Sequence, residues 1–143
     1  MVVHALAVFV TGLLAGEELI VRWGVQPALR GLGDAAHLEA RQALVRRLKV
    51  VVPMLIVPAV VLTVVSLVLS ATTWRWAGAA VLLVFVLTSA IGTVPINIRV
   101  DAWDLDAPPD DWREVVRRWE RIDVLRSSAA VVAFASLLAG LVA

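Results

Sequence analysis

The chain has 143 residues, of which 61% are hydrophobic and 17% are charged. Its mean hydropathy is +0.90. Because soluble domains are only about 45–50% apolar, this composition excludes an ordinary soluble protein and indicates an integral membrane protein. The lack of cysteine excludes a disulfide framework, a thiolate nucleophile and a cysteine-ligated metal, and a net charge of +1 favours no class of charged partner.

Four segments without charged residues follow one another along the chain: residues 1–16, 50–73, 76–98 and 127–143. A membrane-spanning helix needs roughly 20 apolar residues, within a range of about 17 to 25. The second and third segments meet this length, and the first and last reach it with their polar flanks. The first segment lacks the basic start of a signal peptide, so we interpret it as a retained span. The sequence predicts one all-α domain over residues 1–143, an integral membrane four-helix bundle.

Basic residues concentrate in two of the three connections between these segments. Six lie between the first and second segments, and six lie between the third and fourth or at the edge of the fourth. Only Arg75 lies between the second and third. The positive-inside rule therefore places both basic connections in the cytoplasm and both termini outside the cell membrane. Each basic connection is expected to contain a cytoplasmic helix.

Trp119, Asp123 and Arg126 lie where the second basic connection leads into the last apolar segment. At 100° per residue these three side chains fall within about 60° of one another on a helix. Asp123 and Arg126 are three residues apart and can form an ion pair. Charged side chains at the edge of a span are costly unless paired or hydrated, so they mark a candidate functional site. An interfacial salt bridge beside an aromatic anchor is the alternative.

Two more polar residues are expected at the same depth as Asp123. Glu18 follows the first apolar segment, and Asn97 follows Pro95, which should disrupt the third helix. Adjacent helical residues point about 100° apart, so we favour Glu18 over Glu17 for the inward position. The alternative for Glu18 is a surface ion pair with the arginine four residues later.

These residue types suit the removal of a proton from a hydrophobic, weakly acidic carbon. A carboxylate in a partly apolar cavity is a stronger base than one in water. Arg126 and Asn97 can stabilise an oxyanion as it forms. Trp119, together with Trp23 or Trp103, can stack on a flat aromatic ring.

Other kinds of site receive little support. His4 lies near the outer end and His37 lies in the first cytoplasmic connection, so a histidine-rich metal centre is not predicted. The sequence does not exclude a metal site formed by carboxylates. No glycine-rich phosphate loop is present. Acidic residues interleave with the arginines of the second connection, which argues against binding of nucleic acid.

The chain resembles the anthrone oxygenase-like membrane proteins over nearly its whole length. The resemblance is carried by Gly12-x3-Gly16, Pro27, Pro95-x-Asn97, Trp119-x3-Asp123-x2-Arg126 and Ala133-Phe134. It implies a four-helix membrane bundle and a small oxygenase that turns anthrones into anthraquinones in polyketide pathways. Dioxygen would be the co-substrate, and neither a metal nor a flavin cofactor is implied. The family pattern points to Asn97, Trp119 and Arg126, whereas Asp123 stands where the family often has histidine.

In the implied mechanism Asp123 or Glu18 deprotonates the anthrone carbon, and Arg126 and Asn97 hold the enolate oxygen. Two non-enzymatic alternatives stay open. One is a small proton-linked transporter that uses Asp123 and Glu18, and the other is a structural partner protein with the Asp123–Arg126 pair on its outside. The expected partners are a hydrophobic aromatic small molecule and the lipid bilayer, and a homo-oligomer is compatible with the sequence.

Overall fold

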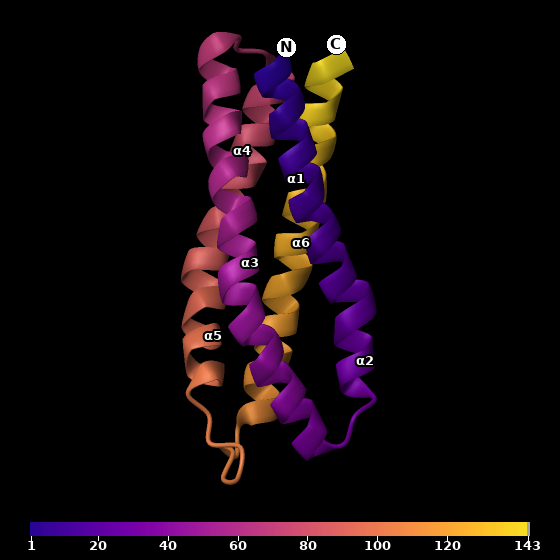
Figure 1. Ribbon diagram of the computed structural model, residues 1–143, viewed down its shortest axis with the longest axis vertical. Coiled ribbons are helices and arrows are strands. Elements are labelled where there is room, and N and C mark those ends of the chain that lie inside the picture. Colours follow the sequence, from indigo (N-terminus) through magenta and orange to yellow (C-terminus); the bar gives the residue numbers. More distant parts are fainter. Residues whose placement is uncertain (143) are drawn as a thin grey trace.

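Four long helical segments pack side by side in the computed structural model, which describes residues 1–142 (Figure 1). Residue 143, the end of the fourth apolar segment, lies outside the described residues. Both termini lie at one end of the bundle (Figure 1). The elements in chain order are α1 (Val2–Ile20), the π-helical turn η1 (Val21–Val25), α2 (Gln26–Arg30), α3 (Asp34–Leu69), α4 (Thr73–Thr88), the π-helical turn η2 (Ser89–Thr93), α5 (Val94–Asp101) and α6 (Trp112–Val142).

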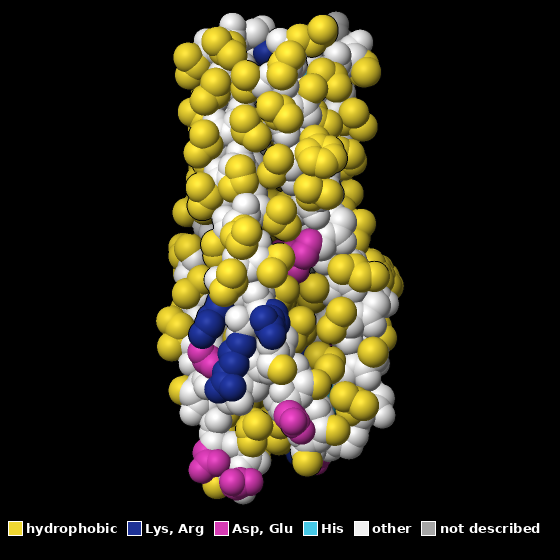
Figure 2. Space-filling model, viewed as in Figure 1, with side chains coloured by type: hydrophobic (Ala, Val, Ile, Leu, Met, Phe, Trp, Pro, Cys, Tyr) yellow, Lys and Arg dark blue, Asp and Glu magenta, His cyan; other side chains and the backbone are white. Residues whose placement is uncertain are grey.

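The prediction of an all-α, multi-pass membrane bundle is confirmed. Four helical segments are long and apolar enough to cross a membrane: Val2–Arg30, Asp34–Leu69, Thr73–Asp101 and Trp112–Val142. Figure 2 shows hydrophobic side chains over the half of the bundle that carries the termini, while most charged side chains lie on the other half. Both basic connections therefore lie at the end opposite the termini. Their cytoplasmic location stays a prediction from the positive-inside rule.

The helices expected in the two basic connections are continuous with the spans. α3 is a single helix of 36 residues. At 1.5 Å per residue it is about 54 Å long, whereas the hydrocarbon core of a bilayer is about 30 Å thick. α6 is built in the same way over 31 residues. Each connection is thus helical mainly because the following span begins well outside the apolar layer.

Pro27 and Pro95 each follow a π-helical turn. Proline has no N–H group, and its ring clashes with the carbonyl four residues earlier in an α-helix. The π turn widens the helix locally, and the Val94 N–H group binds the carbonyl of Ser89 rather than a closer one. The helix consequently continues to Asp101. The expected disruption of the third helix near Pro95 thus takes the form of a π-helical turn, and the helix does not end there.

Two apolar clusters fill the bundle and leave a polar layer between them. The cluster nearer the termini contains Leu14, Ala15, Ala59, Leu82, Phe85, Ala129, Ala130 and Ala133. The other contains Val21, Leu38, Val45, Ile96, Val100, Trp103, Trp112, Val115, Val116 and Trp119. Along α1, Glu18 falls between the two clusters, and along α6 the same is true of Asp123 and Arg126. The fold therefore brings the polar residues of different helices to one level.

Candidate functional site

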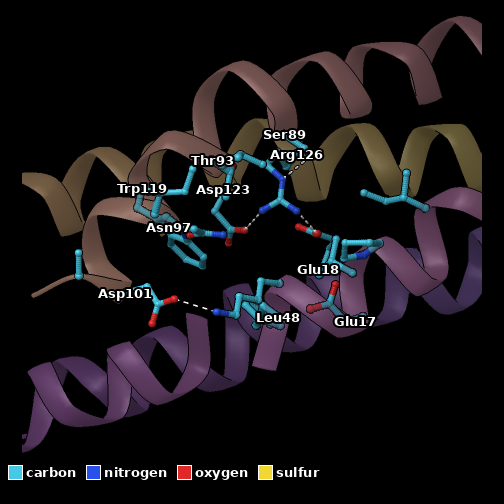
Figure 3. A pocket seen from close by; sticks show the side chains of 18 residues that line it. Glu17, Glu18, Leu48, Ser89, Thr93, Asn97, Asp101, Trp119, Asp123 and Arg126 are labelled. Atoms are coloured by element: carbon cyan, nitrogen blue, oxygen red, sulfur yellow. Dashed lines mark hydrogen bonds and ion pairs between the residues drawn. The ribbon is translucent and has the colours of Figure 1, made fainter. Parts of the chain in front are cut away.

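A cavity of about 520 Å³ lies at the level of the polar layer and is lined by α1, α3, α6 and the segment from η2 to α5 (Figure 3). Most of its lining surface is apolar. Polar side chains from α1, η2, α5 and α6 around Arg126 form what we call the polar wall, and the Lys49–Asp101 pair lies elsewhere in the lining. The lining residues are Glu17, Glu18, Val21, Leu48, Lys49, Val52, Pro53, Ile56, Ser89, Thr93, Val94, Asn97, Ile98, Asp101, Ala102, Trp119, Asp123 and Arg126.

Arg126 is the centre of the polar wall (Figure 3). Its Nη2 donates to Glu18 Oε1 at 2.5 Å, and its Nε donates to Ser89 Oγ at 2.9 Å. Its Nη1 lies 3.7 Å from Asp123 Oδ1. The guanidinium carbon also lies 5.1 Å from the centre of the Phe85 ring. Side chains from α1, α4, η2 and α6 therefore meet at one guanidinium.

The charges at Arg126 are almost completely removed from solvent. The side chain of Arg126 is 5% exposed, and those of Glu18 and Asp123 are each 2% exposed. Two carboxyl groups share one guanidinium, and only Glu18 accepts a hydrogen bond from it, whereas Asp123 is in contact at a longer distance. Glu18 Oε2 and Asp123 Oδ1 accept no hydrogen bond within residues 1–142. Two carboxyl groups that are not fully hydrogen-bonded thus lie beside one buried cation, and a carboxylate of this kind can accept a proton from a ligand.

Glu17 also lines the cavity, which corrects the expectation that only Glu18 points inward. Glu17 is half-buried, and its Oε2 accepts no hydrogen bond within residues 1–142. The cavity is wide enough to contact both neighbours on α1. The alternative ion pair of Glu18 is not formed, because Arg22 Nη1 donates instead to Ser127 Oγ at 3.1 Å and Ser128 Oγ at 3.2 Å.

Trp119 and Asn97 form a fixed pair in the cavity wall. Trp119 Nε1 donates to Asn97 Oδ1 at 2.9 Å. Arg41 places its guanidinium carbon 5.1 Å from the centre of the Trp119 ring. Because the oxygen of Asn97 is already used, its amide N–H groups are the ones left to bind a ligand oxygen. Trp119 is therefore held by contacts on more than one side.

The buried environment of Arg41 was not predicted from the sequence. Arg41 is 1% exposed and donates to Gln26 Oε1 at 3.0 Å, and it lies 3.6 Å from Glu120 Oε1. Arginines in a basic connection are expected to face lipid headgroups. A signal was nevertheless present, since Gln26 lies within an otherwise apolar stretch and provides the partner.

Trp23 and Trp103 do not line the cavity, which corrects the expectation that one of them stacks there with Trp119. Trp23 is 68% exposed, and the guanidinium of Arg22 lies over its ring at 5.0 Å. Trp103 is buried in the apolar cluster that also contains Trp112. Of the three candidate tryptophans, the structure brings only Trp119 to the cavity.

A second group of polar contacts holds α3 to the end of α5 and was missed in the sequence. Asp101 Oδ1 accepts from Arg46 Nε at 2.6 Å, and Asp101 Oδ2 accepts from Lys49 Nζ at 2.8 Å. Gln42 Nε2 donates to the carbonyl oxygens of Val100, Asp101 and Trp103 at 3.2, 3.3 and 2.9 Å. The signal was the spacing of Gln42, Arg46 and Lys49, which places them on one helix face.

The two histidines lie away from the cavity. His4 joins three helices near the termini, with Nδ1 2.9 Å from Ser66 Oγ and Nε2 2.9 Å from the carbonyl oxygen of Leu137. His37 lies beside Arg41, with 3.4 Å between His37 Nε2 and Arg41 Nη2. Within residues 1–142, no group of three or more histidine and carboxylate side chains is arranged to hold a metal ion.

Comparison with known families supports the resemblance seen in the sequence. A family model described as anthrone oxygenase matches residues 42–136, which are 95 of the 143 residues. Asn97, Trp119, Asp123 and Arg126 lie inside the match, whereas Glu18 precedes it. Searches of curated proteins and of solved structures gave no match.

Proposed function

Because the chain belongs to the anthrone oxygenase family, we propose that its cavity is the active site of a small membrane-embedded oxygenase. The proposed substrate is a flat, hydrophobic aromatic molecule of the anthrone class. The observation that carries the proposal is the buried guanidinium of Arg126, which is shared by Glu18 and Asp123 on the wall of a largely apolar cavity.

The cavity suits a ligand of this kind in size and lining. Small-molecule sites usually have volumes of about 300–1,000 Å³ and apolar walls with a few polar groups. Here the volume is about 520 Å³, and Val21, Val52 and Ile56 contribute apolar wall. Trp119 lines the cavity and the guanidinium of Arg41 lies over its ring, so the indole is the candidate for stacking on a flat ring.

In the first proposed step a carboxylate removes a proton from the methylene carbon of the substrate. Glu18 and Asp123 are the candidate bases, because each has an oxygen that accepts no hydrogen bond from the described residues. Proton transfer neutralises that carboxylate and so weakens its attraction to Arg126. The guanidinium can then bind the enolate oxygen that forms at the same moment, assisted by the amide of Asn97. The number of buried charges around Arg126 stays constant, which avoids a large desolvation cost.

In the second proposed step the electron-rich enolate reacts with dioxygen at the carbon that lost its proton. A carbon–oxygen bond forms and gives a peroxide anion, which takes the proton back from the carboxyl group and becomes a hydroperoxide, with both oxygen atoms still present. Loss of water from the peroxide breaks the oxygen–oxygen bond and leaves a second carbonyl group. The balance is one anthrone and one dioxygen to one anthraquinone and one water. The substrate itself supplies the electrons, so this route calls for no resident cofactor.

Turnover by site variants tests the proposal. Purified protein in detergent is given an anthrone, and quinone formation is followed above the rate without protein. Removing one donor to a developing oxyanion typically lowers kcat by about 10²–10³-fold, and we expect this for Arg126→Gln. Asp123→Asn and Glu18→Gln identify which carboxylate is the base. Arg117→Gln, an exposed change on the same helix, is the control. Equal turnover by Arg126→Gln and Arg117→Gln would refute the assignment.

A proton-linked transporter is the second candidate, and one observation favours it. His4, Thr11 and Glu18 are spaced by seven residues, so they share one face of α1, and all three are buried. Thr63 and Ser66 on α3 are also buried. A proteoliposome assay of proton-coupled flux separates the two functions, because an oxygenase should give no flux.

A further inference from the structure

The exposed part of the cavity lining belongs to two elements only. Of the lining residues, those that are exposed are Lys49 and Pro53 on α3, Val94 and Ile98 on α5, and Ala102 directly after α5. The residues that α1 and α6 contribute are buried or half-buried. The mouth of the cavity therefore lies between α3 and α5.

Ion pairs cross one end of this mouth. Lys49 and Arg46 reach from α3 and bind the two carboxylate oxygens of Asp101, the last residue of α5. Gln42, one turn earlier on α3, binds three carbonyl groups at the end of α5. These contacts hold the two helices together at the edge of the apolar segments, so charged side chains cross the end of the mouth nearer the basic connections.

The rest of the mouth lies within the charge-free segments. Pro53 belongs to the segment 50–73, and Val94 and Ile98 belong to the segment 76–98. The side chains of Val94 and Ile98 are 48% and 68% exposed in the isolated chain. A helix face inside a charge-free span contacts lipid chains rather than water. The open part of the mouth thus faces the hydrocarbon layer, just beyond the ion pairs at its boundary.

We propose that ligands enter the cavity laterally from the bilayer, through the mouth between α3 and α5. The ligand is then a molecule dissolved in the hydrocarbon layer, which approaches past Val94 and Ile98 and meets the polar wall at Arg126 only after leaving the lipid. This inference deepens the proposed function, on which it rests for the role of the cavity. It restricts the substrate class to neutral, lipid-soluble aromatics.

The absence of cysteine from the sequence allows a direct test of access. Thr93 lines the cavity and is 5% exposed, so Thr93→Cys introduces one thiol inside it. In proteoliposomes this variant is treated with a neutral apolar maleimide or with a sulfonated maleimide present on both sides of the membrane. Each rate is divided by the rate of the same reagent at Asp106→Cys, an exposed loop position.

We expect the normalised rate of the apolar reagent to exceed that of the sulfonated one by about 50-fold or more, because a charged group is excluded from the hydrocarbon layer. Adding Ile98→Trp should fill the mouth and slow the apolar reagent several-fold. Ile91→Trp is the matched control, since Ile91 is 75% exposed on the same span but does not line the cavity.

Three results would overturn the proposal: equal normalised rates for the two reagents, no labelling of Thr93→Cys by the apolar reagent, or equal effects of Ile98→Trp and Ile91→Trp. Thermal unfolding of both tryptophan variants shows whether the fold is kept. Labelling does not depend on anthrone turnover. A protein that labels as expected but oxidises no anthrone would contradict the proposed function and leave the route from the bilayer standing.

Discussion

Replacing Arg126 by methionine tests how far the buried charges stabilise the bundle. The change keeps an unbranched side chain but removes the hydrogen bonds to Ser89 and Glu18 and the contact with Asp123. Removing one partner of a buried ion pair costs about 3–5 kcal/mol, because the other charge is left without compensation. Since these side chains are at most 5% exposed, solvent screening reduces the value little. We expect Arg126→Met to lower the free energy of unfolding by about 3–5 kcal/mol.

The assay is unfolding by sodium dodecyl sulfate in mixed micelles, followed by circular dichroism. Arg117→Met, an exposed change on α6, should alter the free energy of unfolding by no more than about 0.5 kcal/mol. Adding Glu18→Gln to Arg126→Met removes a stranded charge and should recover about 1–3 kcal/mol. Buried charges do not stabilise the bundle in this way if Arg126→Met costs no more than Arg117→Met, or if the Glu18 and Arg126 changes are simply additive.

Three further predictions concern packing and the support of the cavity. Gly78→Ala should destabilise the protein by about 1–3 kcal/mol through overpacking, because the added Cβ would lie 2.7 Å from Leu137 Cγ. Gly16→Ala is the control and should not destabilise the protein, because its added Cβ would meet no atom of residues 1–142 within 4 Å. Unfolding in mixed micelles compares the two variants. Gln42→Leu should speed amide hydrogen exchange at Trp103 and its neighbours, because it removes the bonds that hold the end of α5; unchanged exchange would contradict this role. Arg41→Met removes the cation–π contact with Trp119, worth about 0.5–2 kcal/mol, and should weaken binding of a flat aromatic ligand because the Trp119 ring is then less firmly held. Arg30→Met, which also removes a Glu120 partner, should leave the ligand Kd unchanged in a fluorescence titration.

The spans were predictable because the physics of the bilayer acts on short stretches of sequence. A charge-free run of about 20 residues is a strong constraint by itself. The common face of Trp119, Asp123 and Arg126 follows from helix geometry alone. Glu18 could be assigned to the same depth because it follows the first charge-free segment. These inferences needed no knowledge of which helix packs against which.

The rest of the site depends on tertiary packing, which one sequence does not specify. Ser89 sits in an apolar run and looks like an ordinary span residue, yet its hydroxyl accepts a hydrogen bond from Arg126. Arg41 looks like a headgroup-facing arginine but is buried behind Trp119. Trp23 and Trp103 are residues that could stack on an aromatic ligand, but neither lines the cavity. Trp23 contacts Arg22, and Trp103 packs in an apolar cluster.

Incorporation of an oxygen atom from dioxygen into the quinone decides whether the protein is an oxygenase. Purified protein is given an anthrone under ¹⁸O₂ in unlabelled water, and the quinone is analysed by mass spectrometry against a sample without protein. The account predicts a rate above that sample, one labelled oxygen atom in each new quinone, and loss of the excess rate in Arg126→Gln. An excess rate that persists in Arg126→Gln, oxygen drawn from water, or no excess rate at all would contradict it.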